Sequence, residues 1–373
     1  MSDFTSYVGE DLAAPFAGAY WFDIVTRRDA CPQLGSEVLL HAGPAFTGTL
    51  PAPVRNAALQ AILFEGMASD SASALALLAT GGVRLEPAQD HRVVTPLAQV
   101  VSASMPMAAV GVQGQACFAP LVEGPAPALR FGASAPECRQ RLHVLAGFAF
   151  SVLAPLIRTH PVALDQVIRA ALAQGDECHS RTGAANEALA SALQGLNPAD
   201  GACLRANQGF VLPILMAAAA WRLATSNGPV EAIGGNGIEF GIRRRGERAW
   251  RTVSAEPPRG TRFAGNEAAV PLNAIGDSAV VDFCGLGGQA LLAAPALVRE
   301  WAASLPADAV TRRSKLVDPH SGIVDPQRVI ASGVAPLINL AILDSSGHAG
   351  LLGRGFCTPN VDLFADDTSM EIQ

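Results

Sequence analysis

The sequence has little charge for its length. Only 16% of its 373 residues are Asp, Glu, Lys or Arg, whereas 50% are hydrophobic. This composition is typical of a folded protein with a large buried core and excludes a disordered chain. The net charge is −7, and the short basic run at residues 243–245 lies between Glu239 and Glu247. We therefore expect no nucleic-acid-binding surface.

Closely spaced cysteines and the motifs of several common enzyme classes are also missing. The seven cysteines are dispersed, without a CxxC pair, and there is no H-E-x-x-H sequence. A zinc site and a disulfide network are therefore not expected. There is no G-x-S-x-G sequence and no P-loop, which argues against a serine hydrolase and a nucleotide-binding enzyme. We expect reduced thiols and no bound metal or organic cofactor.

No apolar run is long enough to predict a membrane span. The two longest runs, at residues 144–157 and 210–221, are shorter than the roughly 18 residues that such a helix needs. Residues 1–16 carry acidic side chains and no basic segment, so no secretory signal is predicted. We expect a cytoplasmic protein that does not contact a membrane.

Three regions of different character follow one another along the chain. Residues 1–130 mix helical and strand patterns, and residues 131–225 carry helical spacing of apolar side chains almost throughout. Residues 226–373 alternate glycine-rich loops with short strands. We predict an α+β fold of two irregular α/β domains, 1–130 and 226–373, with a mostly helical domain at 131–225 between them.

The segment GDECHSRTG concentrates charge at the end of an apolar helical pattern. A helix over residues 162–181 would place Asp176 three residues before His179, and Glu177 four residues before Arg181. An acidic side chain could then orient the imidazole for proton exchange, and the guanidinium could bind an anion. The alternative is a surface ion pair between Glu177 and Arg181 with an exposed histidine, and spacing alone favours this alternative.

Other candidate residues lie in loops and at a predicted strand end. His41 follows the apolar run SEVLL and precedes a Gly-Pro turn, and His91 lies in the loop sequence EPAQDH. The run GLGGQALLAAPALV opens a predicted helix with Gly285, Gly287 and Gly288, whose backbone N–H groups could cradle an anion. Tight packing explains these glycines equally well.

The chain resembles the YlbE-like family from about residue 39 to its C-terminus. The matching runs occur in the family's order: LLHAGP, LFEGMA, SASMP, LRFGA, GDECHSR, GNGIEFGIR, IGDSAV, GLGGQALLAAPA and GLLGRGF. One branch of this family is a subunit of oxamate carbamoyltransferase, which acts in anaerobic purine-nitrogen use and transfers the carbamoyl group of oxalurate to phosphate. The resemblance implies two irregular α+β domains with a small helical domain between them.

The resemblance also implies a function. We expect a carbamoyl-transfer enzyme, or a subunit of one, that acts on a small anionic ureido acid such as oxalurate with phosphate as acceptor. A homo-oligomer is expected, and a carbamoyltransferase partner subunit is an alternative. The chemistry needs acid/base groups, oxyanion or carboxylate clamps, amide-binding groups and close backbone approach. The acid/base candidates are His41, His91, His179, Asp176 and Glu177, and the candidate clamps are Arg130 and Arg181. Asn236 and Glu239 are the candidates for binding an amide, and Gly285, Gly287 and Gly288 are the candidates for close backbone approach.

The chain departs from the family pattern at several polar positions. Gly183 stands where the family has Asn, Gln208 stands where it has Asp, and a histidine before His91 is missing. About forty residues precede the HAGP run, where family members carry an additional N-terminal segment. These departures leave two alternatives open, which are a standalone amidohydrolase of a small amide or ureido compound and a non-catalytic subunit that shapes the site of a partner.

Overall fold

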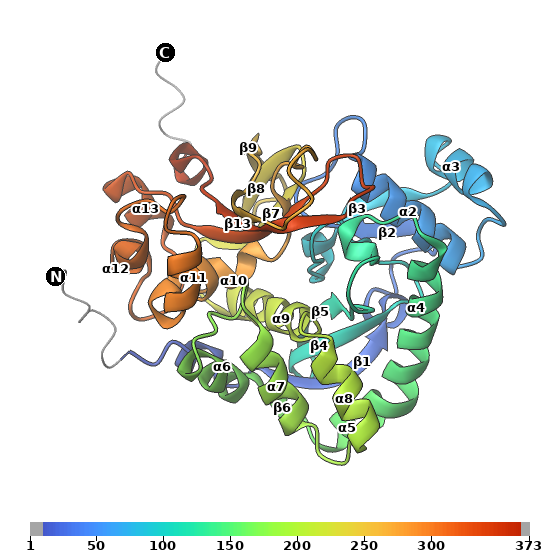
Figure 1. The fold of residues 1–373 in the computed structure, drawn as a ribbon, viewed down its shortest axis with the longest axis horizontal. Coiled ribbons are helices and arrows are strands. Elements are labelled where there is room, and N and C mark those ends of the chain that lie inside the picture. Colours follow the sequence, from blue (N-terminus) through green and yellow to red (C-terminus); the bar gives the residue numbers. More distant parts are fainter. Residues whose placement is uncertain (1–9, 367–373) are drawn as a thin grey trace.

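The computed structural model describes residues 10–366 (Figure 1). This range combines helices with four small sheets, which confirms the α+β prediction. The prediction of no secretory signal rests on residues 1–16, and residues 1–9 of this segment lie outside the described residues.

The first sheet is antiparallel, with the strand order β5-β4-β1-β6. Its strands are β1 (Tyr20–Thr26), β4 (Pro106–Val112), β5 (Gln115–Pro120) and β6 (Val162–Ala163). In the register, Tyr20 lies opposite Gly111 on one side and Ala163 on the other. Since β6 comes from the region 131–225, this sheet joins two of the three predicted regions. The domain boundaries stay a prediction.

A second, two-stranded sheet pairs β2 (Val38–His41) with β3 (Arg84–Pro87) in parallel. Parallel strands need a crossover, and helices α2 (Ala52–Phe64) and α3 (Ser71–Ala79) provide it. Helix α3 begins at a capping box, in which the Asp70 carboxylate accepts the backbone N–H of Ser73 at 2.8 Å. The short helix α1 (Arg27–Ala30) follows β1.

Residues 131–225 are mostly helical, with loops between the helices and the short strand β6. The helices are α4 (Pro136–Phe148), α5 (Ala154–Thr159), α6 (Leu164–Ala173), α7 (Gly183–Ala192), α8 (Pro198–Ala206) and α9 (Val211–Thr225). A π-helical turn at Ala149–Leu153 joins α4 to α5 without a break. Helix α6 ends eight residues before position 181, so the prediction of one helix over 162–181 is wrong.

The continuous helix Pro136–Thr159 is longer than the apolar run that the sequence suggests. Its 24 residues are long and apolar enough to cross a membrane by length and composition, and 28% of its apolar window is buried in the protein. Helices α8 and α9 pass the same test only when taken together, with a bend of 75° between them. Core helices of soluble proteins also have this length and composition. The expectation that the protein does not contact a membrane therefore stays a prediction.

The C-terminal third contains two further antiparallel sheets and short helices. One sheet has the order β11-β7-β8-β9 and the other the order β10-β13-β12. The strands are β7 (Val230–Asn236), β8 (Glu239–Arg244), β9 (Arg251–Ser254), β10 (Arg259–Arg262), β11 (Ile275–Gly276), β12 (Ile338–Leu343) and β13 (Leu351–Cys357). The helices are α10 (Ala279–Phe283), α11 (Pro295–Glu300), α12 (Arg312–Leu316) and α13 (Pro326–Ser332).

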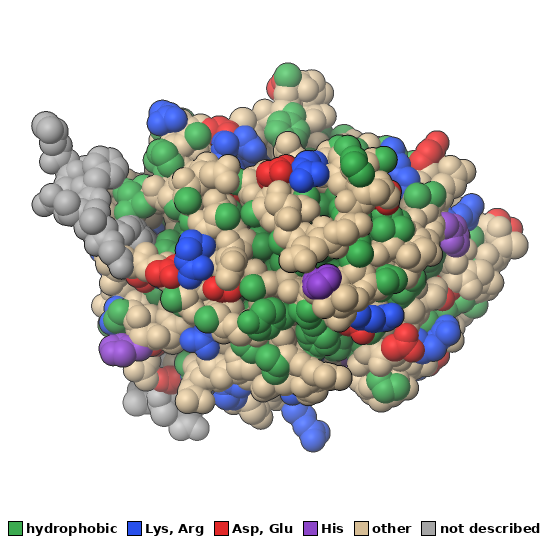
Figure 2. All heavy atoms as spheres, turned by 90° about the horizontal axis from the view of Figure 1, so that it is seen from below, with side chains coloured by type: hydrophobic (Ala, Val, Ile, Leu, Met, Phe, Trp, Pro, Cys, Tyr) green, Lys and Arg blue, Asp and Glu red, His purple; other side chains and the backbone are tan. Residues whose placement is uncertain are grey.

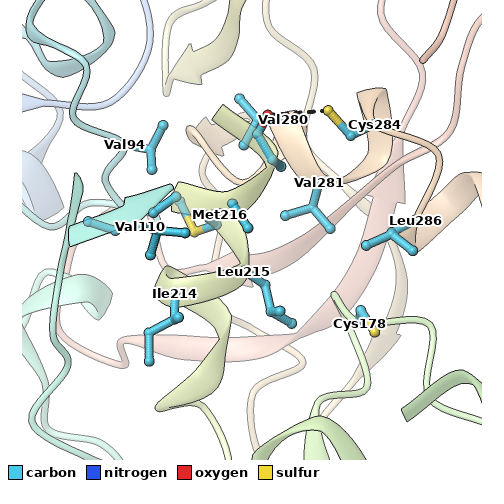
Figure 3. Packing of buried hydrophobic residues seen from close by; sticks show 14 of the residues in the cluster. Val94, Val110, Cys178, Ile214, Leu215, Met216, Val280, Val281, Cys284 and Leu286 are labelled. Atoms are coloured by element: carbon cyan, nitrogen blue, oxygen red, sulfur yellow. Dashed lines mark hydrogen bonds between the residues drawn. The ribbon is translucent and has the colours of Figure 1, made fainter. Parts of the chain in front are cut away.

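Helices α9 and α10 lie in the middle of the molecule and form the centre of its largest hydrophobic core (Figure 1). Figure 3 shows side chains of β4, α9 and α10 around this centre, including Val110, Met216 and Val280. The thiol of Cys284 donates a hydrogen bond to the carbonyl of Ala219 at 3.3 Å (Figure 3). Cys178 belongs to the same core, so this packing holds the backbone next to His179.

The low charge of the sequence is visible on the surface. Figure 2 shows the molecule from below, on the side where Figure 1 places α5 and α8. Apolar and uncharged atoms dominate this face, and charged side chains are scattered singly or in small groups. This face carries no large patch of one charge, as expected for a protein with few charged residues.

Candidate functional site

A cavity of about 230 Å³ lies beside α9 and α10. Most of its wall is apolar, with Leu97, Leu212 and Leu340 among the lining side chains. Five polar or charged residues also line it: Arg130, His179, Ser180, Ser278 and Arg354. A mostly apolar cavity with a few convergent polar groups has the general form of a small-molecule site.

The guanidinium of Arg130 is buried and makes no hydrogen bond with residues 10–366. It lies in the short 3-10 turn Leu129–Phe131 and is 9% exposed. Its guanidinium carbon lies 4.4 Å from the centre of the Phe131 ring, and Nη1 is buried without a partner among residues 10–366. Burial lowers the pKa of Arg130, and the negative charge of the nearby Glu123 opposes this shift.

Glu123 does not neutralise Arg130 through a direct hydrogen bond. Its carboxylate accepts the backbone N–H of Leu129, the residue that precedes the arginine. Burial also raises the pKa of Glu123. The guanidinium therefore keeps its donors available to a molecule in the cavity.

His179 and Asp282 form a buried pair at the same cavity. Nδ1 of His179 lies 2.7 Å from Oδ2 of Asp282, and the aspartate is 0% exposed. The other carboxylate oxygen accepts the backbone N–H groups of Gly288 at 2.6 Å and Asn339 at 3.1 Å. Burial alone would lower the pKa of His179, but the charge and hydrogen bond of Asp282 outweigh it and raise the pKa. With Nδ1 held by the carboxylate, Nε2 is the atom that can exchange a proton.

The acidic residues next to His179 do not orient its ring, contrary to the interpretation of the sequence. Asp176 caps α7, because its carboxylate accepts the N–H groups of Ala184 at 2.9 Å and Ala185 at 3.1 Å. The helix that would have aligned Asp176 with the histidine ends at Ala173, and the chain then turns with positive φ at Gly175.

Glu177 also binds backbone and not the guanidinium of Arg181. Its carboxylate accepts the N–H groups of Ser180 and Arg181, and it accepts the side-chain amide of Asn339 at 3.1 Å. Burial raises its pKa to about 7. The predicted surface pair between Glu177 and Arg181 is therefore wrong, and the carboxylate fixes the turn that carries His179.

The glycine-rich loop binds an anion of the protein itself. Gly288 donates to the Asp282 carboxylate, and the N–H of Gly287 donates to the carbonyl of Glu177 at 2.8 Å. A Cβ at Gly287, where φ is +52°, would clash with the Asp282 carboxylate. A Cβ at Gly285 would lie 2.5 Å from the carbonyl oxygen of Gly322. These glycines allow close approach of backbone, but the hydrogen bonds of Gly287 and Gly288 hold the His179–Asp282 pair and its loop.

His41 and His91 do not line this cavity. His41 is 1% exposed, with its ring against Phe46 and Nδ1 at 2.8 Å from the carbonyl of Ala42. Burial lowers its pKa to about 4. His91 pairs with Glu86 at 3.0 Å and lines a separate cleft next to β1 and β5. The structure therefore brings only His179 of these three histidines to the cavity.

Asn236 and Glu239 belong to the β7–β8 hairpin and likewise lie outside the lining of the cavity. The Asn236 amide donates to the carbonyl of Pro44 and accepts the N–H groups of Ile238 and Glu239. The Glu239 carboxylate accepts the hydroxyl of Thr252 at 2.8 Å. These contacts stabilise the hairpin and attach it to the HAGP loop.

Two buried aspartates, one just before α10 and one within it, are not recognised as site residues in the sequence. Asp282 orients His179, and Asp277 accepts Gly43 N–H at 2.9 Å, Gln89 Nε2 at 2.7 Å and Thr95 N–H at 2.8 Å. Burial raises the pKa of Asp277 to about 7. The available signal was the presence of two carboxylates in the otherwise apolar run GDSAVVDF.

Ser278 follows Asp277 and is a further site residue that the sequence interpretation missed. It is 1% exposed, lines the cavity, and its hydroxyl has no hydrogen-bond partner among the described residues. Leu97, another lining residue, has a positive φ of +52°. Backbone conformations of this kind are sparsely populated for residues other than glycine and concentrate at functional sites.

The thiols and carboxylates offer no obvious metal site in the described part of the chain. No group of three or more His, Cys, Asp and Glu side chains is placed to hold a metal ion within residues 10–366. Cys178, next to His179, is buried, which raises the pKa of its thiol well above the usual range. The site residues therefore provide guanidinium, imidazole–carboxylate and hydroxyl chemistry.

Comparisons with known proteins give this geometry a family context. A family model described as "Oxamate carbamoyltransferase subunit AllG" matches residues 83–278. The chain is 29% identical to the oxamate carbamoyltransferase subunit AllG of Escherichia coli K12, over 91% of this chain and 90% of the relative. It is also 29% identical to the uncharacterized protein YahG of the same strain, over 88% of this chain and 77% of the relative.

A solved structure shares the fold of this chain. The crystal structure of a conserved protein of unknown function from Enterococcus faecalis V583 is 27% identical, with a TM-score of 0.82. The match covers 95% of this chain and 94% of the other. Because the family model matches more than half of the sequence, the chain belongs to the family of the oxamate carbamoyltransferase subunit AllG.

Proposed function

We propose that this chain carries a carbamoyl-transfer site that binds a small anionic amide or ureido acid, such as oxamate or oxalurate. The observation that supports this proposal concerns one cavity. The buried guanidinium of Arg130, which makes no hydrogen bond with residues 10–366, lines the same cavity as His179, the partner of Asp282. An unpaired buried charge costs several kcal/mol. The carboxylate of a ligand would offset that cost by accepting two parallel hydrogen bonds from Arg130.

The proposed chemistry is the transfer of a carbamoyl group between nitrogen and phosphate. A phosphate oxygen attacks the carbamoyl carbon of oxalurate and forms a C–O bond. The C–N bond to the oxamate nitrogen breaks, and this nitrogen takes a proton from Nε2 of His179. In the reverse direction Nε2 takes the proton back when the oxamate nitrogen attacks carbamoyl phosphate.

Asp282 has a defined part in this proposal. It stabilises the protonated imidazole and holds Nδ1 as a donor, so that Nε2 is the proton-exchanging atom. Ser278 lies at the same cavity with an unpartnered hydroxyl that can donate to the carbonyl oxygen of a bound amide. We assign no role in proton transfer to His41 or His91.

The proposal includes a partner subunit, because the relative AllG is described as one subunit of an oxamate carbamoyltransferase. The test is the phosphate-dependent breakdown of oxalurate to oxamate and carbamoyl phosphate. It is measured for the complex purified through a tag on this chain, and for the chain alone.

Two variants and a control decide whether the site is in this chain. R130Q and H179Q should each lower kcat/KM by about 100-fold, the scale of a lost charged hydrogen bond or a lost general acid. The control is R169Q, which removes a guanidinium that is 49% exposed and pairs with Asp11. Full activity of both site variants in the complex would establish the non-catalytic subunit. Turnover by the chain alone without phosphate would establish an amidohydrolase.

A further inference from the structure

A second cavity of about 360 Å³ lies on the other side of the loop that carries His179. It shares two lining residues, Ser180 and Arg354, with the first cavity. The two cavities therefore adjoin, and the shared residues lie between them.

The loop distributes three consecutive residues over the two cavities. His179 lines the first cavity, Ser180 lines both, and Arg181 lines the second. The buried Glu177 carboxylate fixes this arrangement because it accepts the N–H groups of both Ser180 and Arg181. Cys178, with a positive φ of +70°, turns the backbone immediately before His179.

The second cavity contains two guanidinium groups with available donors. The Arg181 guanidinium makes no hydrogen bond or ion pair with residues 10–366, and the residue is half-buried. Arg354 donates to Glu300 through Nε at 2.9 Å and Nη2 at 2.6 Å. Its Nη1 has no partner within the described range. Asp176, an acidic lining residue, is committed to backbone N–H groups of the α7 N-terminus and of Cys178.

We propose that this second cavity is the subsite for the phosphoryl group, as inorganic phosphate or as the phosphate of carbamoyl phosphate. Arg181 would bind two of its oxygens with its planar fork, and Nη1 of Arg354 would bind a third. This inference rests on the proposed function and adds the location of the second reactant.

Charge and size explain why the two reactants would occupy separate cavities. The first cavity is mostly apolar, and Arg130 is its one lining cation without a described partner. Two anions placed there would repel each other in a medium that screens charge poorly. With the acid in the first cavity and the phosphoryl group in the second, the carbamoyl carbon lies at their junction. Ser180 and Arg354 line both cavities at that junction, and His179 lines the first cavity directly before Ser180, so the proton-exchanging group is beside the bond that breaks.

The experiment separates the two subsites by their Michaelis constants. The complex purified through a tag on this chain is assayed with oxalurate and inorganic phosphate varied independently. R181Q should raise KM for phosphate about 10- to 100-fold and change KM for oxalurate less than about twofold. R181K should also raise KM for phosphate, because lysine keeps the charge but loses the two-pronged geometry. R130Q should show the reverse pattern, and R169Q should change neither constant.

The outcomes distinguish this inference from the proposed function. An unchanged KM for phosphate in R181Q, with a raised KM for oxalurate in R130Q, would overturn the second subsite and leave the first. Equal increases of both constants in R181Q would show that Arg181 acts on the shared loop, and would overturn separate subsites as well. No effect of either R130Q or R181Q would overturn the proposed function itself. Melting temperatures of all variants show whether each protein is folded.

Discussion

Replacing Asp282 by asparagine should nearly abolish proton transfer while leaving the fold in place. The wild-type carboxylate uses Oδ2 for His179 and Oδ1 for the N–H groups of Gly288 and Asn339. In D282N, the amide oxygen must face those two backbone donors. The NH₂ group then faces Nδ1 of His179, which becomes an acceptor. The neutral ring then carries its single proton on Nε2. Giving this proton to the oxamate nitrogen would leave an imidazolate, so the ring is a far weaker acid than the imidazolium that Asp282 stabilises.

Two effects are expected from this change. General acid–base catalysis contributes about 10²- to 10⁴-fold to a rate, so kcat should fall by this amount. Asp282 raises the pKa of His179 against the effect of burial. In D282N only the charge of Glu177 still opposes the effect of burial, so the pKa of His179 should be lower than in the wild type. Any residual activity that needs the imidazolium should therefore be lost at a lower pH than in the wild type.

The assay is phosphate-dependent oxalurate breakdown by the complex, measured from pH 5 to about pH 9 so as to span the ordinary histidine titration. The control is D176N, which weakens the cap of α7 without touching His179. D176N should lower the melting temperature but leave the pH profile unchanged. The reasoning is refuted if D282N keeps more than about a tenth of kcat, because that loss is below the range for general acid–base catalysis. It is also refuted if the D282N profile coincides with that of the wild type.

Three further variants test individual contacts. H41L should leave kcat unchanged. Its free energy of unfolding should fall less than that of the wild type when the pH is lowered from about 6.5 to about 4. Between these pH values His41 stays neutral in the folded protein while the unfolded chain binds a proton. In urea titrations, the slope of the unfolding free energy against pH should therefore be about 1.4 kcal/mol per pH unit more positive in the wild type than in H41L. G287A should lose activity and melt lower than G246A, because both glycines have positive φ but only the former has the Asp282 carboxylate in the path of a Cβ. S278A should keep its melting temperature, since the hydroxyl has no partner, but should raise KM for oxalurate several-fold.

Much of the fold and part of the site could be predicted from the sequence. Composition and periodicity are sufficient to predict an α+β protein with a helical middle region, because they report burial and local geometry. The charge-rich segment is predicted from the sequence to carry site residues, and the structure places His179 and Arg181 at the two cavities, while their roles stay a prediction. Its prediction as a helix failed because Gly175 and Cys178 adopt positive φ. The residue types Gly and Cys do not by themselves determine a positive φ at these positions, because the conformation also depends on packing against the surrounding core.

Contacts between distant segments explain the remaining differences. The partner of His179 is 103 positions away in the sequence, so spacing within the cluster pointed to the wrong carboxylates. His41 is an example of the opposite error. It follows a strand next to a turn, where α/β enzymes often place site residues, yet its side chain is buried against Phe46. A sequence pattern can show that a polar residue lies at a strand end, but only the packing shows which way it faces.

The buried carboxylates explain why such a weakly charged chain keeps acidic residues in its core. Asp277 binds backbone N–H groups at Gly43 and Thr95, and Asp282 binds those at Gly288 and Asn339. Asp277 lies two residues before α10 and Asp282 lies within it, so this five-residue helix and the residues directly before it connect loops from the first and last thirds of the chain. The His179 loop, from the middle third, attaches to the same helix. The cavity therefore forms only when all three regions are folded together, and its acid/base residue is held by the same contacts that hold the fold.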